Sequence, residues 1–167
     1  MQLVLWGAIA VISVVLDNIT KHLASSLAGG KTASFIPGII NFQYVENTGA
    51  AFGMMKGQRW LFITISSVAI LAIIVFMIVN RKKMCALLGI GLAMIVGGGV
   101  GNQIDRIALG YVIDFIHFDF YFPVLEDFPT FNVADSFVTV GAVIVVIAVL
   151  FFEKNLFGDK KEISPNE

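Results

Sequence analysis

Two aspartates, Asp114 and Asp135, are the residues of this 167-residue chain whose types and surroundings best suit chemistry. Asp114 lies within the apolar run Val-Ile-Asp-Phe-Ile at 112–116, where a carboxylate is unusual. Two carboxylates a few ångström apart cannot both ionise, so the pKa of one rises and the pair titrates as a unit. The ionised member can take a proton from a water that attacks a carbonyl carbon, while the neutral member donates to the oxyanion that forms. The pair therefore predicts hydrolysis at a carbonyl group.

Asp135 taken alone also has a structural interpretation. Asn132 is a good N-cap residue, and an acidic residue three positions later lies in the first helical turn, where the helix dipole stabilises it. For this reason we assign Asp135 as the ionised partner. Asp114, in the more apolar segment, is then the proton carrier.

Further polar residues fall near the ends of long apolar segments. A polar group without a partner is costly in hydrocarbon, so such residues are expected to be paired or to contact a ligand. Besides the two aspartates, this set comprises Asn47, Asn102, Asp105, Arg106 and Asn132. An alternative for the consecutive Asp105 and Arg106 is an interfacial pair that anchors a helix end, with the arginine reaching toward lipid headgroups.

Other chemistries are disfavoured. The single cysteine, Cys85, adjoins the basic run at 81–83 and is far along the chain from both histidines, so a Cys–His nucleophile is not expected. His117 follows Asp114 by three residues, but two histidines without a metal-binding spacing do not predict a metal site. The glycines at 97–99 and 101 lie inside an apolar segment and predict close helix packing rather than phosphate binding.

Composition places the chain in a membrane. Hydrophobic residues make up 57% of it and charged residues 14%, with a mean hydropathy of +0.88. A soluble domain is roughly 45–50% apolar and about 25% charged. The net charge is −1 and no basic tract is longer than the one at 81–83, so we expect no nucleic-acid partner.

Four segments are long and apolar enough to cross a bilayer, which requires about 20 helical residues. The expected spans cover about residues 3–24, 60–79, 84–104 and 135–152. The first includes Asp17 and Lys21, which are four residues apart and so share a helix face where they can pair. A cleaved signal peptide is the alternative for this N-terminus. The small residues at 25–30 favour it, and the lack of Lys or Arg before the apolar stretch disfavours it.

The positions of Lys and Arg orient these spans. The turn at 81–83 and the tail after the fourth span carry basic residues, so both termini are expected in the cytoplasm, with the connections at 28–59 and 105–135 outside. Stretches at 39–45 and 111–122 predict a small outer sheet, and residues 50–55 a short interfacial helix. The expected fold class is a membrane all-α bundle of four transmembrane helices with a small extracytoplasmic β-sheet. We expect one domain over 1–158 and a polar cytoplasmic tail at 159–167.

Five motifs, in this order, resemble those of the prolipoprotein signal peptidases, the bacterial signal peptidase II family of membrane aspartyl proteases. They are Asp-Asn-Ile-Thr-Lys at 17–21, Asn-Thr-Gly-Ala-Ala-Phe-Gly at 47–53, Gly-Gly-Gly-Val-Gly-Asn-Gln-Ile-Asp-Arg at 97–106, Val-Ile-Asp-Phe-Ile at 112–116 and Phe-Asn-Val-Ala-Asp-Ser at 131–136. Gly99 stands where the family usually has alanine. The resemblance covers essentially the whole chain.

The resemblance implies an aspartyl endopeptidase that removes the signal peptide from bacterial prolipoproteins just before the diacylglyceryl-modified cysteine. The family's catalytic dyad corresponds to Asp114 and Asp135. Residues implied to hold substrate backbone or orient the aspartates are Asn47, Asn102, Arg106 and Asn132. Residues implied to be structural are Asp17, Lys21 and Asp105. The implied partners are lipid-modified signal peptides, membrane lipids and cyclic peptide antibiotics, with no metal or cofactor. The implied location is the cytoplasmic membrane, with the active site at its outer surface.

Two other functions remain open from the residues alone. A small carrier or proton-relay protein would string polar residues across the membrane depth, but the second and third expected spans carry no charge in their interiors. A structural membrane subunit would use the aspartates as caps and anchors. It would keep its function after Asp114→Asn.

Overall fold

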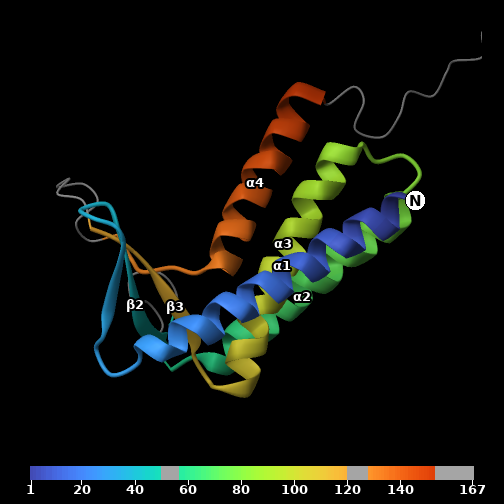
Figure 1. The fold of residues 1–167 in the computed structure, drawn as a ribbon. Coiled ribbons are helices and arrows are strands. Elements are labelled where there is room, and N and C mark those ends of the chain that lie inside the picture. The colour runs from blue at the N-terminus through green and yellow to red at the C-terminus, as the bar shows by residue number, and fades with distance from the viewer. Residues whose placement is uncertain (50–56, 120–127, 153–167) are drawn as a thin grey trace, which may run out of the picture.

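The computed structural model describes residues 1–49, 57–119 and 128–152. Within them lie four long helices, α1 (Gln2–Ala24), α2 (Arg59–Asn80), α3 (Ala86–Ala108) and α4 (Val133–Phe152) (Figure 1). A short 3₁₀ turn, η1 (Ser25–Leu27), follows α1. All four helices are long and apolar enough to cross a membrane. The four predicted apolar helices are therefore confirmed, and the largest difference in bounds is at the end of α3, which was predicted at 104 and lies at Ala108.

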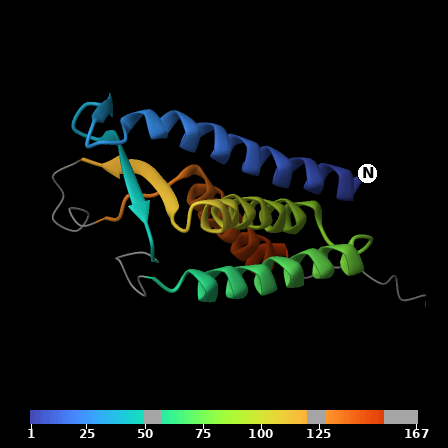
Figure 2. The same ribbon diagram turned by 90° about the horizontal axis from the view of Figure 1, so that it is seen from below.

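Three strands form an antiparallel sheet at the end of the bundle opposite the N-terminus (Figure 2). Their order is β1 (Thr32–Ile36), β2 (Ile40–Asn47) and β3 (Val112–Phe118). In the turn between β1 and β2, Gly38 has a φ of 71°, a left-handed conformation that favours glycine. The predicted small sheet is confirmed, with β1 as an additional strand. The predicted interfacial helix at 50–55, the tail at 159–167 and the end of the stretch at 111–122 lie outside the described residues.

α3 is the central helix, and α1, α2 and α4 all pack against it (Figure 2). Its glycines let neighbouring backbones come close, as small residues do in membrane bundles. A Cβ at Gly97 would fall 2.7 Å from the carbonyl oxygen of Ala10 in α1. A Cβ at Gly91 would fall 2.8 Å from the carbonyl oxygen of Gly141 in α4. The predicted role of the glycine run in close helix packing is confirmed.

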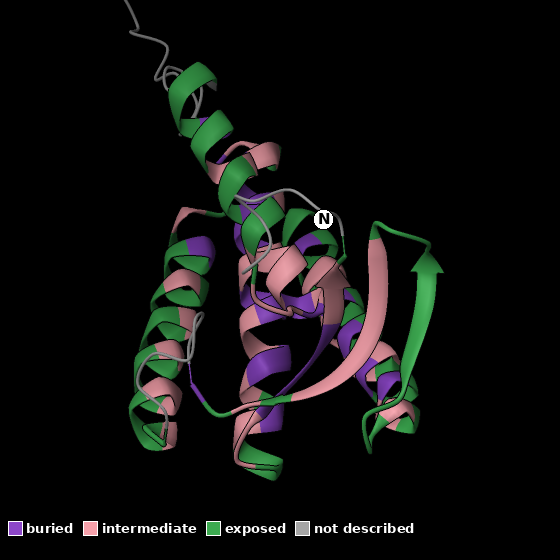
Figure 3. Cartoon of the chain, turned by 90° about the vertical axis from the view of Figure 1, so that its left-hand side faces the viewer, coloured by how far each residue is buried: buried purple, intermediate pink, exposed green. Residues whose placement is uncertain are grey.

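Buried residues concentrate on α3 and on β3, the two elements that lie innermost (Figure 3). The outward faces of α1, α2 and α4 instead expose large apolar side chains such as Val11, Val75 and Leu150. Exposed apolar faces of this extent suit helices that are surrounded by lipid tails, since the bilayer provides no penalty for them. The buried polar side chains, among them Asp17, Lys21 and Asn102, lie instead in the interior of the bundle.

A buried ion-pair cluster joins α1 to α3. The Nζ of Lys21 lies 2.8 Å from Oδ2 of Asp17 and 2.9 Å from Oδ2 of Asp105. The predicted pairing of Asp17 with Lys21 is confirmed. The interfacial pair of Asp105 with Arg106 is wrong, because consecutive helical residues do not face each other. Arg106 instead places its guanidinium 5.2 Å from the ring centroid of Phe62 in α2.

Asp17→Asn is expected to lower the free energy of unfolding by about 3 kcal/mol, because it breaks one half of a buried ion pair. The amide oxygen that replaces Oδ1 can still accept the N–H of Ala134, to which Asp17 is bound at 2.9 Å. We therefore expect the variant to retain turnover at temperatures where it is folded. Thermal unfolding in detergent, followed alongside activity, measures both. Normal thermal stability with lost turnover would contradict this prediction.

Candidate active site

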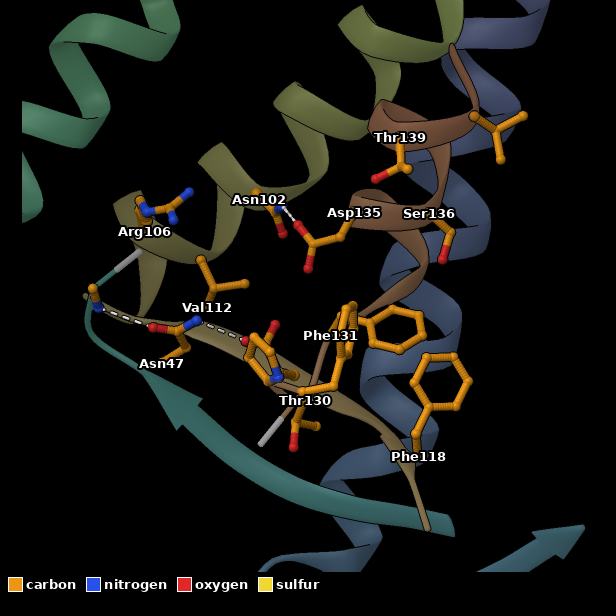
Figure 4. Close-up of a pocket in the computed structure, with 15 residues that line it drawn as sticks. Asn47, Asn102, Arg106, Val112, Phe118, Thr130, Phe131, Asp135, Ser136 and Thr139 are labelled. Carbon is orange, nitrogen blue, oxygen red and sulfur yellow. Dashed lines mark hydrogen bonds between the residues drawn. The ribbon is translucent and has the colours of Figure 1, made fainter. Parts of the chain in front are cut away.

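Asp114 lies in β3 and is almost completely buried, with 2% of its surface exposed. In the pairing of β2 with β3, Val45 stands opposite Asp114, so Asn47 is its diagonal neighbour on the same face. The Nδ2 of Asn47 donates to Oδ2 of Asp114 at 2.8 Å, and its Oδ1 accepts the N–H of Gly49 at 3.0 Å (Figure 4). The strand register thus fixes one side of the Asp114 carboxyl group.

Asp135 lies in the first turn of α4 and forms a reciprocal cap with Asn132. The Oδ1 of Asn132 accepts the N–H of Asp135 at 2.8 Å, and Oδ2 of Asp135 accepts the N–H of Asn132 at 3.2 Å. The predicted cap is confirmed. The other carboxylate oxygen, Oδ1, accepts from Nδ2 of Asn102 at 2.7 Å (Figure 4). The capping role therefore occupies only one of the two oxygens.

Asn132 links the surroundings of the two aspartates. Its side chain is fully buried, and its Nδ2 donates to Oδ1 of Asp114 at 2.7 Å and to Oδ1 of Asn102 at 3.1 Å. Since Asn102 in turn donates to Asp135, both carboxyl groups belong to one hydrogen-bond network. Three asparagines from β2, α3 and the start of α4 thereby hold two aspartates that are 21 residues apart in the sequence.

Both aspartates open onto a single pocket of about 520 Å³. One wall is polar and the other is apolar. The polar wall contains Asn47, Asn102, Arg106, Asp114 and Asp135. The apolar wall contains Val112, Phe118, Phe128, Pro129, Phe131 and Val140.

The aromatic part of the apolar wall was not predicted as part of a site. Phe131 lies with its ring centroid 5.3 Å from that of Phe118 in β3 (Figure 4). The ring centroid of Phe128 lies 5.9 Å from that of Phe131. An isolated bridge between Ile116 and Phe131 brings the segment before α4 onto the free edge of β3. The clustering of phenylalanines around Pro129 is the signal that could have indicated this wall.

Burial raises the pKa of Asp114 to about 7, and the negative charge of Asp135 acts in the same direction. The hydrogen bonds from Asn47 and Asn132 and the positive charge of Lys21 oppose that rise. Asp114 can therefore hold a proton near neutral pH. This behaviour suits the proton carrier of a carboxylate pair.

Arg106 is the cation of the polar wall (Figure 4). Among residues 1–49, 57–119 and 128–152, its guanidinium donates no hydrogen bond, although it rests on the ring of Phe62. No group in these ranges therefore competes for its donors when a carbonyl or carboxylate group enters the pocket. Within the same ranges, no three His, Cys, Asp or Glu side chains converge in a way that could hold a metal ion.

Comparison with known proteins gives a consistent result. A family model described as Signal peptidase (SPase) II matches residues 9–151. The chain is 40% identical over 150 residues to a lipoprotein signal peptidase of Symbiobacterium thermophilum, a match that covers 87% of this chain and 94% of the relative. It is 39% identical to a lipoprotein signal peptidase of Streptococcus pyogenes serotype M5, with 83% and 88% covered.

Solved structures are similar as well. A bacterial membrane enzyme solved by the in meso method superposes with a TM-score of 0.78 at 31% identity, covering 93% of this chain and 92% of the other. A second bacterial membrane enzyme solved by the in meso method superposes with a TM-score of 0.75 at 32% identity, covering 86% of this chain and 91% of the other.

Proposed function

The chain belongs to the signal peptidase II family, and from this membership we propose that Asp114 and Asp135 form its catalytic pair. The protein is a membrane protease that removes the signal peptide from prolipoproteins. The observation that carries the proposed pair is the shared network of Asn102 and Asn132, which holds both carboxyl groups at one pocket.

In the proposed mechanism a water binds between the two carboxyl groups. Ionised Asp135 takes a proton from this water as the water oxygen attacks the scissile carbonyl carbon. Protonated Asp114 donates its proton to the oxyanion that develops on the carbonyl oxygen. Collapse of the tetrahedral intermediate returns the proton to Asp114. Asp135 gives its proton to the leaving amine, which restores the starting state. Asn102 and Asn132 keep the two carboxyl groups oriented throughout the cycle.

The pocket suits a peptide that carries a lipid. Arg106 can bind main-chain carbonyl groups of an extended segment, and the aromatic wall can receive an apolar group. We place the cut just before the diacylglyceryl-modified cysteine, whose acyl chains remain among membrane lipids. A cyclic peptide antibiotic that reached the two aspartates would occupy the same space and block turnover.

The proposed orientation has the pocket and the sheet at the outer membrane surface and both termini in the cytoplasm. The basic turn at 81–83 lies between α2 and α3, at the bundle end opposite the sheet (Figure 2). Basic residues favour the cytoplasmic side, which supports this orientation. A signal peptide spans the membrane as an apolar helix, so its cleavage point would arrive at the depth of the sheet.

Cleavage of a defined precursor tests the proposed function. Purified protein is incubated with a precursor peptide that bears a diacylglyceryl group on its cysteine, and the products are identified by mass spectrometry. We expect one cut immediately before the modified cysteine and no cut in the unmodified peptide. Cleavage at another bond, or equal cleavage of both peptides, would show that the pocket does not recognise the lipid-modified junction.

The pH dependence of kcat/KM is expected to have an alkaline limb near pH 7. Asp114, whose pKa is raised to about 7, must be protonated in the proposed mechanism, so activity falls as pH rises through that value. In Asn47→Leu, a hydrogen bond that lowers the pKa of Asp114 is lost, so the limb moves to higher pH. A limb that stays in place in this variant would argue against Asp114 as the proton carrier.

A further inference from the structure

Lys21 is a buried cation whose three partners all belong to the surroundings of the catalytic pair. Its Nζ lies 2.8 Å from Oδ2 of Asp17, 2.9 Å from Oδ2 of Asp105 and 3.0 Å from Oδ1 of Asn102. An ammonium group has three N–H donors, so these three acceptors saturate it. Because the side chain is only 3% exposed, these protein groups replace water as the hydrogen-bond partners of the ammonium group.

The two carboxylates that Lys21 contacts each hold the backbone immediately before a catalytic aspartate. Oδ2 of Asp105 accepts the N–H of Ile113 at 3.1 Å, and Ile113 directly precedes the aspartate of β3. Oδ1 of Asp17 accepts the N–H of Ala134 at 2.9 Å, and Ala134 directly precedes the aspartate of α4. One ammonium group is thus ion-paired with both carboxylates that anchor β3 and α4 at the pocket.

The third partner, Asn102, is oriented by the same ammonium group. Only the oxygen of an amide can accept from an ammonium, so Lys21 determines which end of the Asn102 side chain faces α1. The amino end is then turned toward Asp135, to which it donates at 2.7 Å. Without the ammonium, the orientation of the amide would depend on its own bond to Asp135 and on one longer hydrogen bond from Asn132, at 3.1 Å.

We propose that Lys21 is the positioning residue of the catalytic pair, setting the backbone of β3, the first turn of α4 and the Asn102 amide through one ammonium group. The proposal rests on the proposed function of the two aspartates. It gives Lys21 a part in turnover beyond its pairing with Asp17 along one face of α1. The cluster is closely fitted, since a Cβ at Gly101 would fall 2.5 Å from Oδ2 of Asp17.

The proposal has an electrostatic signature. The charged groups that act on Asp114 are Lys21 from α1, Arg106 from α3 and Asp135 from α4. The positive charge of Lys21 lowers the pKa of Asp114 and so opposes the effect of burial. Loss of this charge leaves the pKa of Asp114 higher, so the alkaline limb of the activity profile moves to higher pH.

A charge-matched double variant tests the proposal. Lys21→Met with Asp17→Asn removes one positive and one negative charge, and is compared with Asp17→Asn alone. With the lipid-modified precursor peptide, we expect kcat roughly 100-fold below that of Asp17→Asn, because the reacting groups are misplaced. We expect KM to stay within about twofold, because substrate contacts are retained. Ser13→Ala, at a buried position one turn before Asp17 in α1, is the control and is expected to behave as wild type.

Several outcomes would overturn the positioning role. The positioning role is overturned if a folded double variant keeps kcat within about threefold of Asp17→Asn. It is also overturned if the alkaline limb of the double variant lies at the same pH as that of Asp17→Asn. If this variant does not fold, Lys21→Met with Asp105→Asn provides a second charge-matched pair with the same expected results. Failure of both pairs to fold would assign Lys21 to folding alone. Wild-type cleavage that is abolished by Asp114→Asn keeps the proposed function standing in every one of these cases.

Discussion

Asp114→Asn and Asp135→Asn are each expected to lower kcat by roughly 10²–10⁴-fold, because each removes a group that transfers a proton in the transition state. Asparagine matches aspartate in size but can neither take a proton from water nor carry one to the oxyanion. Binding of the lipid-modified precursor should survive, since the apolar wall and Arg106 are untouched. Turnover and equilibrium binding of the same peptide, measured on the same preparations, separate the two effects.

The two variants also have a structural cost that must be measured. Both oxygens of Asp114 accept from amide donors, and both oxygens of Asp135 accept from donors as well. In asparagine an NH2 group replaces one of the two carboxylate oxygens and faces the donor that this oxygen had accepted from. The lost hydrogen bond costs about 1–3 kcal/mol of stability. Thermal unfolding of each variant therefore accompanies the kinetics, and assays are run well below the lower transition.

Asp119→Asn is the matched control for these substitutions. Asp119 directly follows β3 and accepts from Nδ2 of Asn41 at 2.8 Å, but it is exposed and does not line the pocket. We expect its turnover to equal that of wild type. Full activity in either Asp114→Asn or Asp135→Asn would exclude a two-carboxylate mechanism and would favour capping and anchoring roles for these residues.

Much of the fold follows from local properties of the sequence. Hydropathy summed over about 20 residues predicts a membrane span without reference to any other part of the chain, and all four spans were predicted in this way. The cap formed by Asn132 and Asp135 and the pairing of Asp17 with Lys21 also depend only on spacing within one helix. Such contacts are predictable because the spacing of the two residues within one helix fixes their relative positions.

Contacts between elements were harder to predict. Asp105 was considered a partner of its neighbour Arg106, yet it pairs with Lys21, 84 positions earlier in the sequence. The partner of Asp105 depends on which face of α3 packs against α1. The glycines of α3 predict that helices pack closely there, but they do not identify which helix packs against which face. The aromatic wall was missed for a related reason, since its phenylalanines meet only when the segment before α4 joins the edge of β3.

The motif residues illustrate the same limit. Asn47, Asn102 and Asn132 were implied either to hold substrate backbone or to orient the aspartates, and the sequence could not decide between these roles. In the structure all three amides donate to the carboxyl groups, which favours orientation, whereas Arg106 lines the pocket without a hydrogen-bond partner among the described residues. The roles themselves stay a prediction until the variants are assayed.

The adjacent glycines of α3 provide a matched pair of positions for a second test. A Cβ at Gly98 would collide with the carbonyl oxygen of Ala134, the backbone that directly precedes Asp135. Within the described ranges, a Cβ at Gly99 would come close only to the side chain of Ile70, with the nearest atom at 3.1 Å. Alanine therefore clashes with the backbone of α4 at position 98 and, in the part of the chain that the structure describes, contacts only a side chain, that of Ile70, at position 99.

Gly98→Ala is expected to destabilise the protein by about 1–3 kcal/mol through overpacking. Because α4 must shift away from α3 at the turn that holds Asp135, we also expect kcat to fall by roughly 100-fold. Gly99→Ala should keep wild-type turnover and gain up to about 1 kcal/mol from the higher helix propensity of alanine. Thermal unfolding and precursor cleavage on both variants measure these effects. Equal behaviour of the two variants would mean that the contact between Gly98 and Ala134 does not position the carboxylate of α4.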